Sequence, residues 1–180
     1  VVPGIGHCRV SIMATPKLGA SFVWYQVEAE PKLGGTSKLF ATEAGVEAFA
    51  YCIEGSGTFT AGTDTRNITT GAYVYAPAGV GIGFQNTGDT PMKLLLYKQR
   101  YIPLNGVEPV VVFGNVNDIP YRDYDNMTNV HVKDLLPIDK RFDMNFHILS
   151  FDPGGCHPFF ETHVQEHGMY ILEGEGAYFF

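Results

Sequence analysis

An eleven-residue string occurs twice in this chain of 180 residues, and this repeat constrains the fold more than any other feature. Residues 47–57 read EAFAYCIEGSG and residues 166–176 read EHGMYILEGEG, with five identical positions at an offset of 119. A second pair lies upstream of these strings, where EPKLGG at residues 30–35 is similar to DPGG at residues 152–155. Such repeats indicate that one supersecondary unit is built twice. We therefore expect two related domains.

Each unit consists of short segments that are rich in alternating, β-branched or aromatic residues. The segments predicted to be strands are residues 21–30, 48–54, 57–60, 72–76 and 92–99. Glycine and proline, with 21 and 11 residues, separate these segments. No stretch keeps a helical period of about 3.6 residues over three turns. The chain is therefore expected to be all-β.

The charge balance argues against two classes of partner. Twelve Lys and Arg residues stand against nineteen Asp and Glu residues, which gives a formal net charge of −7. Nucleic-acid binders need a basic face, and anionic membranes attract cationic surfaces, so neither is expected as a partner. No apolar run in the sequence reaches the roughly 20 residues of a membrane span. The expected partner is a small-molecule substrate.

The second unit contains a pattern of side chains that suits a metal ion. Glu161 and His163 are two residues apart on an expected strand, which places both side chains on one face. His167 follows four residues later, after an expected turn or bulge, and can rejoin that face. Two imidazoles and a carboxylate can hold a first-row divalent metal ion with open positions. We expect these three residues to be metal ligands.

This spacing resembles the first motif of the cupin superfamily, G-x5-H-x-H-x3/4-E-x6-G, with Glu and His exchanged at the outer ligand positions. In the first unit, residues 71–86 resemble the second cupin motif, G-x5-P-x-G-x2-H-x3-N, except that Ile82 replaces the ligand histidine. The resemblance implies a bicupin, in which two double-stranded β-helix (jelly-roll) barrels follow one another. The second barrel is expected to be incomplete within these 180 residues.

The bicupin resemblance implies three parts. Residues 1–100 are expected to form the first barrel, residues 101–141 a linker with connecting strands, and residues 142–180 the N-terminal part of the second barrel. Only the second barrel is expected to bind metal. At the offset of 119, the first unit has Thr42, Ala44 and Ala48 where the second has its three ligands. With Ile82 as well, the first barrel is expected to be free of metal.

The string FETHVQEHG, with LEG after it, is similar to the (S)-ureidoglycine aminohydrolase family, whose relatives include proteins labelled glyoxylate-induced. The resemblance implies a manganese-dependent hydrolase that releases ammonia from (S)-ureidoglycine in the breakdown of allantoin, leaving (S)-ureidoglycolate. It implies Mn²⁺ on Glu161, His163 and His167, although other first-row divalent ions suit the same donors. A fourth ligand, a glutamine in this family, is expected beyond residue 180. We also expect Glu161 to act in catalysis and in substrate binding, and Tyr178 to contact the substrate.

The resemblance further implies a homo-oligomer, located in the cytoplasm of a bacterium or in the endoplasmic reticulum of a plant. Two alternatives remain open from the residues alone. One is another metal-dependent cupin enzyme, such as a dioxygenase or an isomerase, because two histidines and a carboxylate also suit Fe²⁺ and O₂. The other is a bicupin that binds a ligand without catalysis, because one fold serves many functions.

Overall fold

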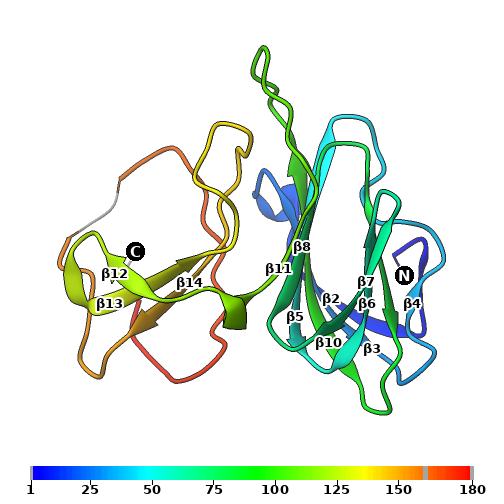
Figure 1. Cartoon of the computed structure of the whole chain (residues 1–180), viewed down its shortest axis with the longest axis horizontal. Helices are drawn as coiled ribbons and strands as arrows, with labels where there is room; N and C mark the ends of the chain where they lie inside the picture. Colours follow the sequence, from blue (N-terminus) through cyan, green and yellow to red (C-terminus); the bar gives the residue numbers. More distant parts are fainter. Residues whose placement is uncertain (1, 160–161, 179–180) are drawn as a thin grey trace.

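The computed structural model describes residues 2–159 and 162–178. Over these residues the chain forms two bodies, a larger one on the right of Figure 1 and a smaller one on the left. The larger body contains strands β1–β11 and the smaller body contains β12–β14. Among the described residues, the helical segments are two short 3₁₀ helices, η1 (Pro16–Leu18) and η2 (Val116–Asp118). The predicted all-β class is confirmed.

The larger body is made of two antiparallel sheets. In spatial order, the first sheet contains β1 (Ile5–Gly6), β4 (Gly35–Thr36), β9 (Ile82–Asn86), β6 (Ser56–Ala61) and β7 (Asp64–Thr69). The second contains β11 (Val112–Asn115), β8 (Ala72–Ala76), β5 (Val46–Glu54), β10 (Met92–Arg100), β3 (Val23–Ala29) and β2 (Cys8–Ala14). The smaller body has one antiparallel sheet of β12 (Arg122–Tyr124), β13 (Met127–Asp134) and β14 (His147–Phe151).

The two sheets of the larger body enclose one apolar core. Its fully buried side chains come from both sheets and include Phe59, Val74, Ile82, Leu94 and Leu96. Two antiparallel sheets that close over a shared core in this way form a jelly-roll barrel. The predicted double-stranded β-helix is therefore present in this body.

All five strands predicted from residue pattern are present, as β3, β5, β6, β8 and β10. Gly55 separates β5 from β6 with a φ of 99°, a left-handed conformation that favours glycine. Within residues 1–100, the sequence did not predict β1, β2, β4, β7 and β9. In β7, five of the six residues are exposed, so the strand shows no apolar alternation by which it could be recognised.

Strands β5 and β8 are buried on both faces. Their inner side chains, such as Ala50 and Val74, belong to the barrel core. A second apolar cluster lies on the outer face, and its buried members are Phe49, Tyr51, Tyr73, Tyr75, Leu135, Leu136 and Met144. The last three come from the chain between β13 and β14, so this segment covers the outer face. Burial on both faces explains why β8 reads as a continuous apolar run.

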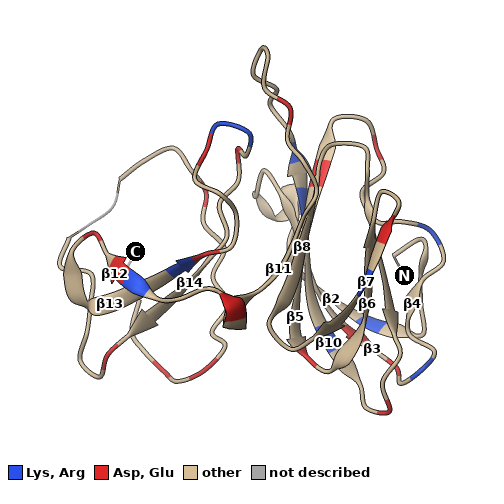
Figure 2. Ribbon diagram, in the orientation of Figure 1, with Lys and Arg blue, Asp and Glu red and all other residues tan. Residues whose placement is uncertain are grey.

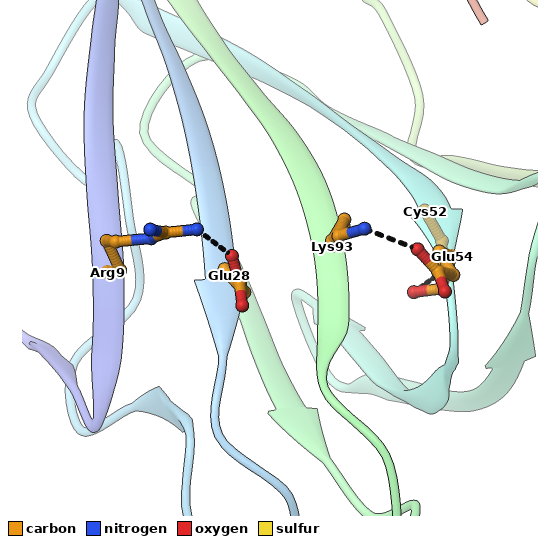
Figure 3. Close-up of polar contacts among 5 residues, drawn as sticks. All are labelled: Arg9, Glu28, Cys52, Glu54 and Lys93. Carbon is orange, nitrogen blue, oxygen red and sulfur yellow. Dashed lines mark hydrogen bonds and ion pairs between the residues drawn. The ribbon is translucent and has the colours of Figure 1, made fainter.

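Charged side chains of both signs lie on loops and strands of both bodies (Figure 2). One row of them crosses four strands of the six-stranded sheet. Arg9 pairs in register with Glu28, Glu28 with Lys93, and Lys93 with Glu54, so the charges alternate along the row. Arg9 forms an ion pair with Glu28, and Lys93 Nζ lies 2.7 Å from Glu54 Oε2 (Figure 3). Opposite charges on neighbouring strands favour this register over a shifted one.

The smaller body repeats a pairing of the larger one. Cys8 pairs with Ala29 across β2 and β3, and Val130 pairs with Phe151 across β13 and β14. Both partners are displaced by the same 122 residues, close to the offset of 119 in the repeated strings. The backbone hydrogen bond that follows each pair is repeated too, at 2.9 and 3.1 Å (Glu30 N to His7 O, Asp152 N to Asn129 O). The repeated pairing ends at Glu30 and Asp152, which are the first residues of the similar upstream strings EPKLGG and DPGG.

The described part of residues 152–178, which we call the C-terminal segment, contains no strand. The prediction that Glu161 and His163 lie on one strand is therefore not supported at His163, and Glu161 lies outside the described residues. A strand needs a neighbour to complete its hydrogen bonds. In the first unit the matching string forms β5, which pairs with β8 and β10. Within the described residues, no strand pairs with the C-terminal segment.

Candidate metal centre

Two of the three predicted ligands lie together. The ring centroids of His163 and His167 are 4.6 Å apart, with an angle of 45° between the ring planes. Both side chains are exposed. The C-terminal segment therefore brings the two imidazoles side by side without a regular strand.

Their separation allows both imidazoles to be ligands of one metal ion. Rings whose centroids are 4.6 Å apart are close enough for one nitrogen of each to reach the same ion.

The third predicted ligand, Glu161, lies outside the described residues. Within residues 2–159 and 162–178, no group of three or more His, Cys, Asp or Glu side chains is arranged to hold a metal ion. Of the predicted ligands, the structure therefore describes the two histidines. Tyr178, the predicted substrate contact, is described and is 56% exposed.

The residues on either side of His167 contact the larger body. Glu166 Oε2 accepts a hydrogen bond from the backbone N–H of Ser21 at 2.8 Å. A Cβ atom added to Gly168 would lie 3.0 Å from Cζ3 and 3.1 Å from Cε3 of Trp24. These contacts link positions more than 140 residues apart, and no local sequence pattern predicts them.

The corresponding positions of the first barrel lie in a different environment. Ala48 and Ile82 are fully buried and belong to the apolar core. Thr42 and Ala44 are exposed. Methyl and alkyl side chains donate no electron pair to a metal ion, so none of Ala44, Ala48 and Ile82 can be a ligand.

A buried polar cluster lies between the two bodies and was not identified from sequence. Glu47 is fully buried, and it accepts hydrogen bonds from Tyr75 Oη at 2.6 Å and from Gln99 Nε2 at 2.8 Å. Gln99 Nε2 also donates to Asp143 Oδ1 at 3.2 Å, which joins the cluster to the chain before β14. Burial and a hydrogen bond with the Asp143 carboxyl raise the pKa of Glu47 to about 8.

An aromatic stack precedes the histidine pair. The ring of His157 lies 5.1 Å from that of Tyr124 and 5.5 Å from that of Phe159, with interplanar angles of 21° and 8°. Its Nε2 atom is buried and has no hydrogen-bond partner among the described residues. In sequence, His157 stands outside the Glu-x-His-x3-His pattern, so spacing gave no reason to single it out.

Comparison with known proteins identifies the family. Residues 31–97 match the family model described as "Cupin domain". Over 178 residues, the chain is 44% identical to the (S)-ureidoglycine aminohydrolase of Escherichia coli (strain K12), an alignment that covers 99% of this chain and 67% of that protein. The chain belongs to the (S)-ureidoglycine aminohydrolase family. This confirms the resemblance seen in the histidine motif.

Members of the ureidoglycine aminohydrolase family occur in plants, and related folds have been solved. The (S)-ureidoglycine aminohydrolase of Arabidopsis thaliana is 25% identical over 169 residues, covering 92% of this chain and 54% of that protein. Protein Ylba from E. coli superposes with a TM-score of 0.78 at 38% identity, covering 87% of this chain and 61% of that one. A glyoxylate-induced protein of Pseudomonas aeruginosa gives 0.80 at 27% identity, covering 91% and 62%.

This member of the ureidoglycine aminohydrolase family thus spans about two thirds of the E. coli protein and about half of the plant protein. Among its described residues, no helix is long and apolar enough to cross a membrane.

Proposed function

We propose that the protein hydrolyses (S)-ureidoglycine to (S)-ureidoglycolate and ammonia. The observation that carries the proposal is the 44% identity, over 178 residues, to the E. coli protein of that name. In the reaction, the bond between carbon and the amino nitrogen breaks and a bond to the oxygen of water forms. One proton of the water leaves with the ammonia, and the hydroxyl stays on the carbon. The step needs no oxidant or reductant.

In this proposal, His163, His167 and Glu161 hold a divalent metal ion, and Mn²⁺ is the proposed cofactor. The separation of 4.6 Å between the two rings supports the two imidazoles as ligands of one ion. A carboxylate adds a hard oxygen donor, which suits Mn²⁺. When bound, such an ion polarises the substrate and lowers the pKa of coordinated water.

Proton transfer and substrate binding are assigned to side chains of this chain. We assign catalysis and substrate binding to Glu161, because a carboxylate oxygen can accept a proton from the attacking water. We assign a substrate contact to Tyr178, because a phenol can donate a hydrogen bond to the carboxylate of ureidoglycine. Its exposure of 56% leaves that side chain accessible to a ligand.

The proposal gives the two domains different roles. Residues 1–100 form a barrel without metal, residues 101–141 connect, and residues 142–180 begin the metal-binding barrel. Full burial of Ala48 and Ile82 in the first barrel core supports the first assignment. The repeated strand pairing of β2–β3 in β13–β14 supports a second barrel, and its strand β13 lies within the connecting residues.

We further propose a homo-oligomer that acts in allantoin breakdown, in the cytoplasm if the source is a bacterium and in the endoplasmic reticulum if it is a plant. Strand β2 lies at one end of the six-stranded sheet, and Ile12 and Met13 on it are 61% and 42% exposed. An open sheet edge with exposed apolar side chains supports association, because such edges are commonly covered.

The proposal is tested by following ammonia release from ureidoglycine generated in situ from allantoate. The intact protein is measured with Mn²⁺, after chelation, and as Glu161→Gln. We expect release to depend on the metal ion and to fall at least about a hundredfold in the variant, because a proton acceptor and a ligand are lost together. Glu108→Gln, an exposed glutamate in the loop after β10, is the matched control and should keep full activity.

Two results would contradict the proposal. Ammonia release at the spontaneous rate, with metal bound, would exclude ureidoglycine hydrolysis and leave the bicupin fold unaffected. Turnover that requires Fe²⁺ and consumes oxygen would instead identify a dioxygenase.

A further inference from the structure

Each of the two repeated strings contacts the other body. Phe49 of β5 stacks on Phe146, with ring centroids 3.8 Å apart and an interplanar angle of 4°. At the repeat offset of 119, Gly168 takes the place of Phe49. Gly168 lies against Trp24 at the start of β3, just as Phe49 lies against the residue before β14. Each repeated string therefore packs against the start of a strand in the other body, β14 for the first string and β3 for the second.

The contact at Gly168 leaves little space for a side chain. A Cβ atom there would lie 3.0 Å from the indole ring of Trp24, closer than most carbon contacts in proteins. The φ of Gly168 is not among the positive values of the chain, so its backbone conformation does not itself require glycine. The close approach to the indole is what disfavours a side chain here, because the indole would have to move to make room for it.

The neighbouring contact is polar. The carboxylate of Glu166 accepts a hydrogen bond of 2.8 Å from the backbone N–H of Ser21, two residues before β3 begins. A bond from a backbone N–H to a charged acceptor is stronger than a neutral one. Glu166 and Gly168 are the two neighbours of His167, so the larger body holds the chain on both sides of this histidine.

We propose that Glu166 and Gly168 are positioning residues, through which the first barrel holds His167 at metal-binding distance from His163. The inference rests on the metal site of the proposed function. Within the described residues, the C-terminal segment has no strand to fix its shape, so contacts with the larger body must do so. Groups that orient metal ligands typically change affinity about 10- to 100-fold when they are lost. The first barrel thus acts as a support for the site of the second.

The contact at Gly168 is tested by measuring Mn²⁺ affinity calorimetrically on the intact protein. Gly168→Val pushes the segment off the indole, and we expect affinity to fall about tenfold. Adding Trp24→Ala makes room for valine, and we expect the double variant to return to within about threefold of Trp24→Ala alone. Gly6→Val is the matched control, because Gly6 has open space around it and lies in β1.

The hydrogen bond of Glu166 is tested with two variants. Glu166→Gln keeps an oxygen that can accept from Ser21, so affinity should stay within about threefold, whereas Glu166→Ala should lose about tenfold. Glu175→Ala removes an exposed carboxylate from the same segment and should have no effect. Equal losses of Mn²⁺ affinity in Glu166→Gln and Glu166→Ala would show that the charge of Glu166 sets the affinity. That result would overturn the role proposed for its hydrogen bond to Ser21.

The outcomes separate this inference from the proposed function. Metal-dependent ammonia release with unchanged Mn²⁺ affinity in Gly168→Val and Glu166→Ala would overturn the inference alone. A loss in Gly168→Val that Trp24→Ala does not relieve would also overturn it. An unaltered protein that binds no divalent ion would overturn both.

Discussion

At the scale of single residues, Glu47 makes folding sensitive to pH. Its pKa of about 8 lies above the usual value of 4.5, because burial and the nearby Asp143 carboxyl disfavour its charge. Between these two pH values the folded chain binds more protons than the unfolded chain. The free energy of unfolding should therefore fall as pH rises, by roughly 1 kcal/mol per pH unit between about pH 5 and pH 8. Urea unfolding of the intact protein at several pH values measures this slope.

The variant Glu47→Gln assigns the slope to this carboxyl. An amide of the same size does not titrate, so the slope should flatten. A slope that persists in Glu47→Gln would attribute it to other groups. The sequence could not predict this behaviour, since Glu47 is only one of five positions shared by the repeated strings. Its partners Gln99 and Asp143 are 52 and 96 residues away, and only the fold brings them together.

At the scale of elements, the doubly buried strand β5 links the two bodies. Phe49 is 1% exposed and stacks directly on Phe146. Phe49→Ala should lower the free energy of unfolding by about 3 kcal/mol, because it removes buried area and leaves a cavity. Phe151→Ala, at 45% exposure, is the control and should cost less than about 1 kcal/mol. Denaturant titration compares the two variants, and equal losses would contradict a structural role for the stack.

The same strands show which elements can be predicted from residue patterns and which cannot. Strands β3, β5, β6, β8 and β10 were predictable because their side chains alternate or run continuously apolar. Strand β7 was not, because it is polar and exposed and forms only by pairing with β6. At His163, spacing gave the right neighbour, His167, but the wrong secondary structure. Strand formation there depends on pairing partners, which a single segment does not contain.

At the scale of the whole molecule, the sequence repeat predicted two related units, and the family motif predicted the kind of site. The sequence could not predict that the first unit supports the site of the second. This support depends on contacts such as the hydrogen bond between Glu166 and Ser21, which are 145 positions apart. Its donor is a backbone N–H, which nearly every residue type has, so the identity of residue 21 gives no sign of it. Motif spacing describes a site along the chain, whereas its support comes from packing between the units.

The proposed metal-binding barrel predicts that the two bodies differ in metal content. The core of the first barrel is filled by apolar side chains, and Ala48, Phe59 and Ile82 in it are each at most 1% exposed. An ion there would lose its hydration without gaining ligands, which is strongly unfavourable. Elemental analysis of the intact protein should therefore find one divalent ion per chain, and the double variant His163→Gln, His167→Gln should contain none. Two ions per chain, or one that remains in the double variant, would place metal outside the histidine pair.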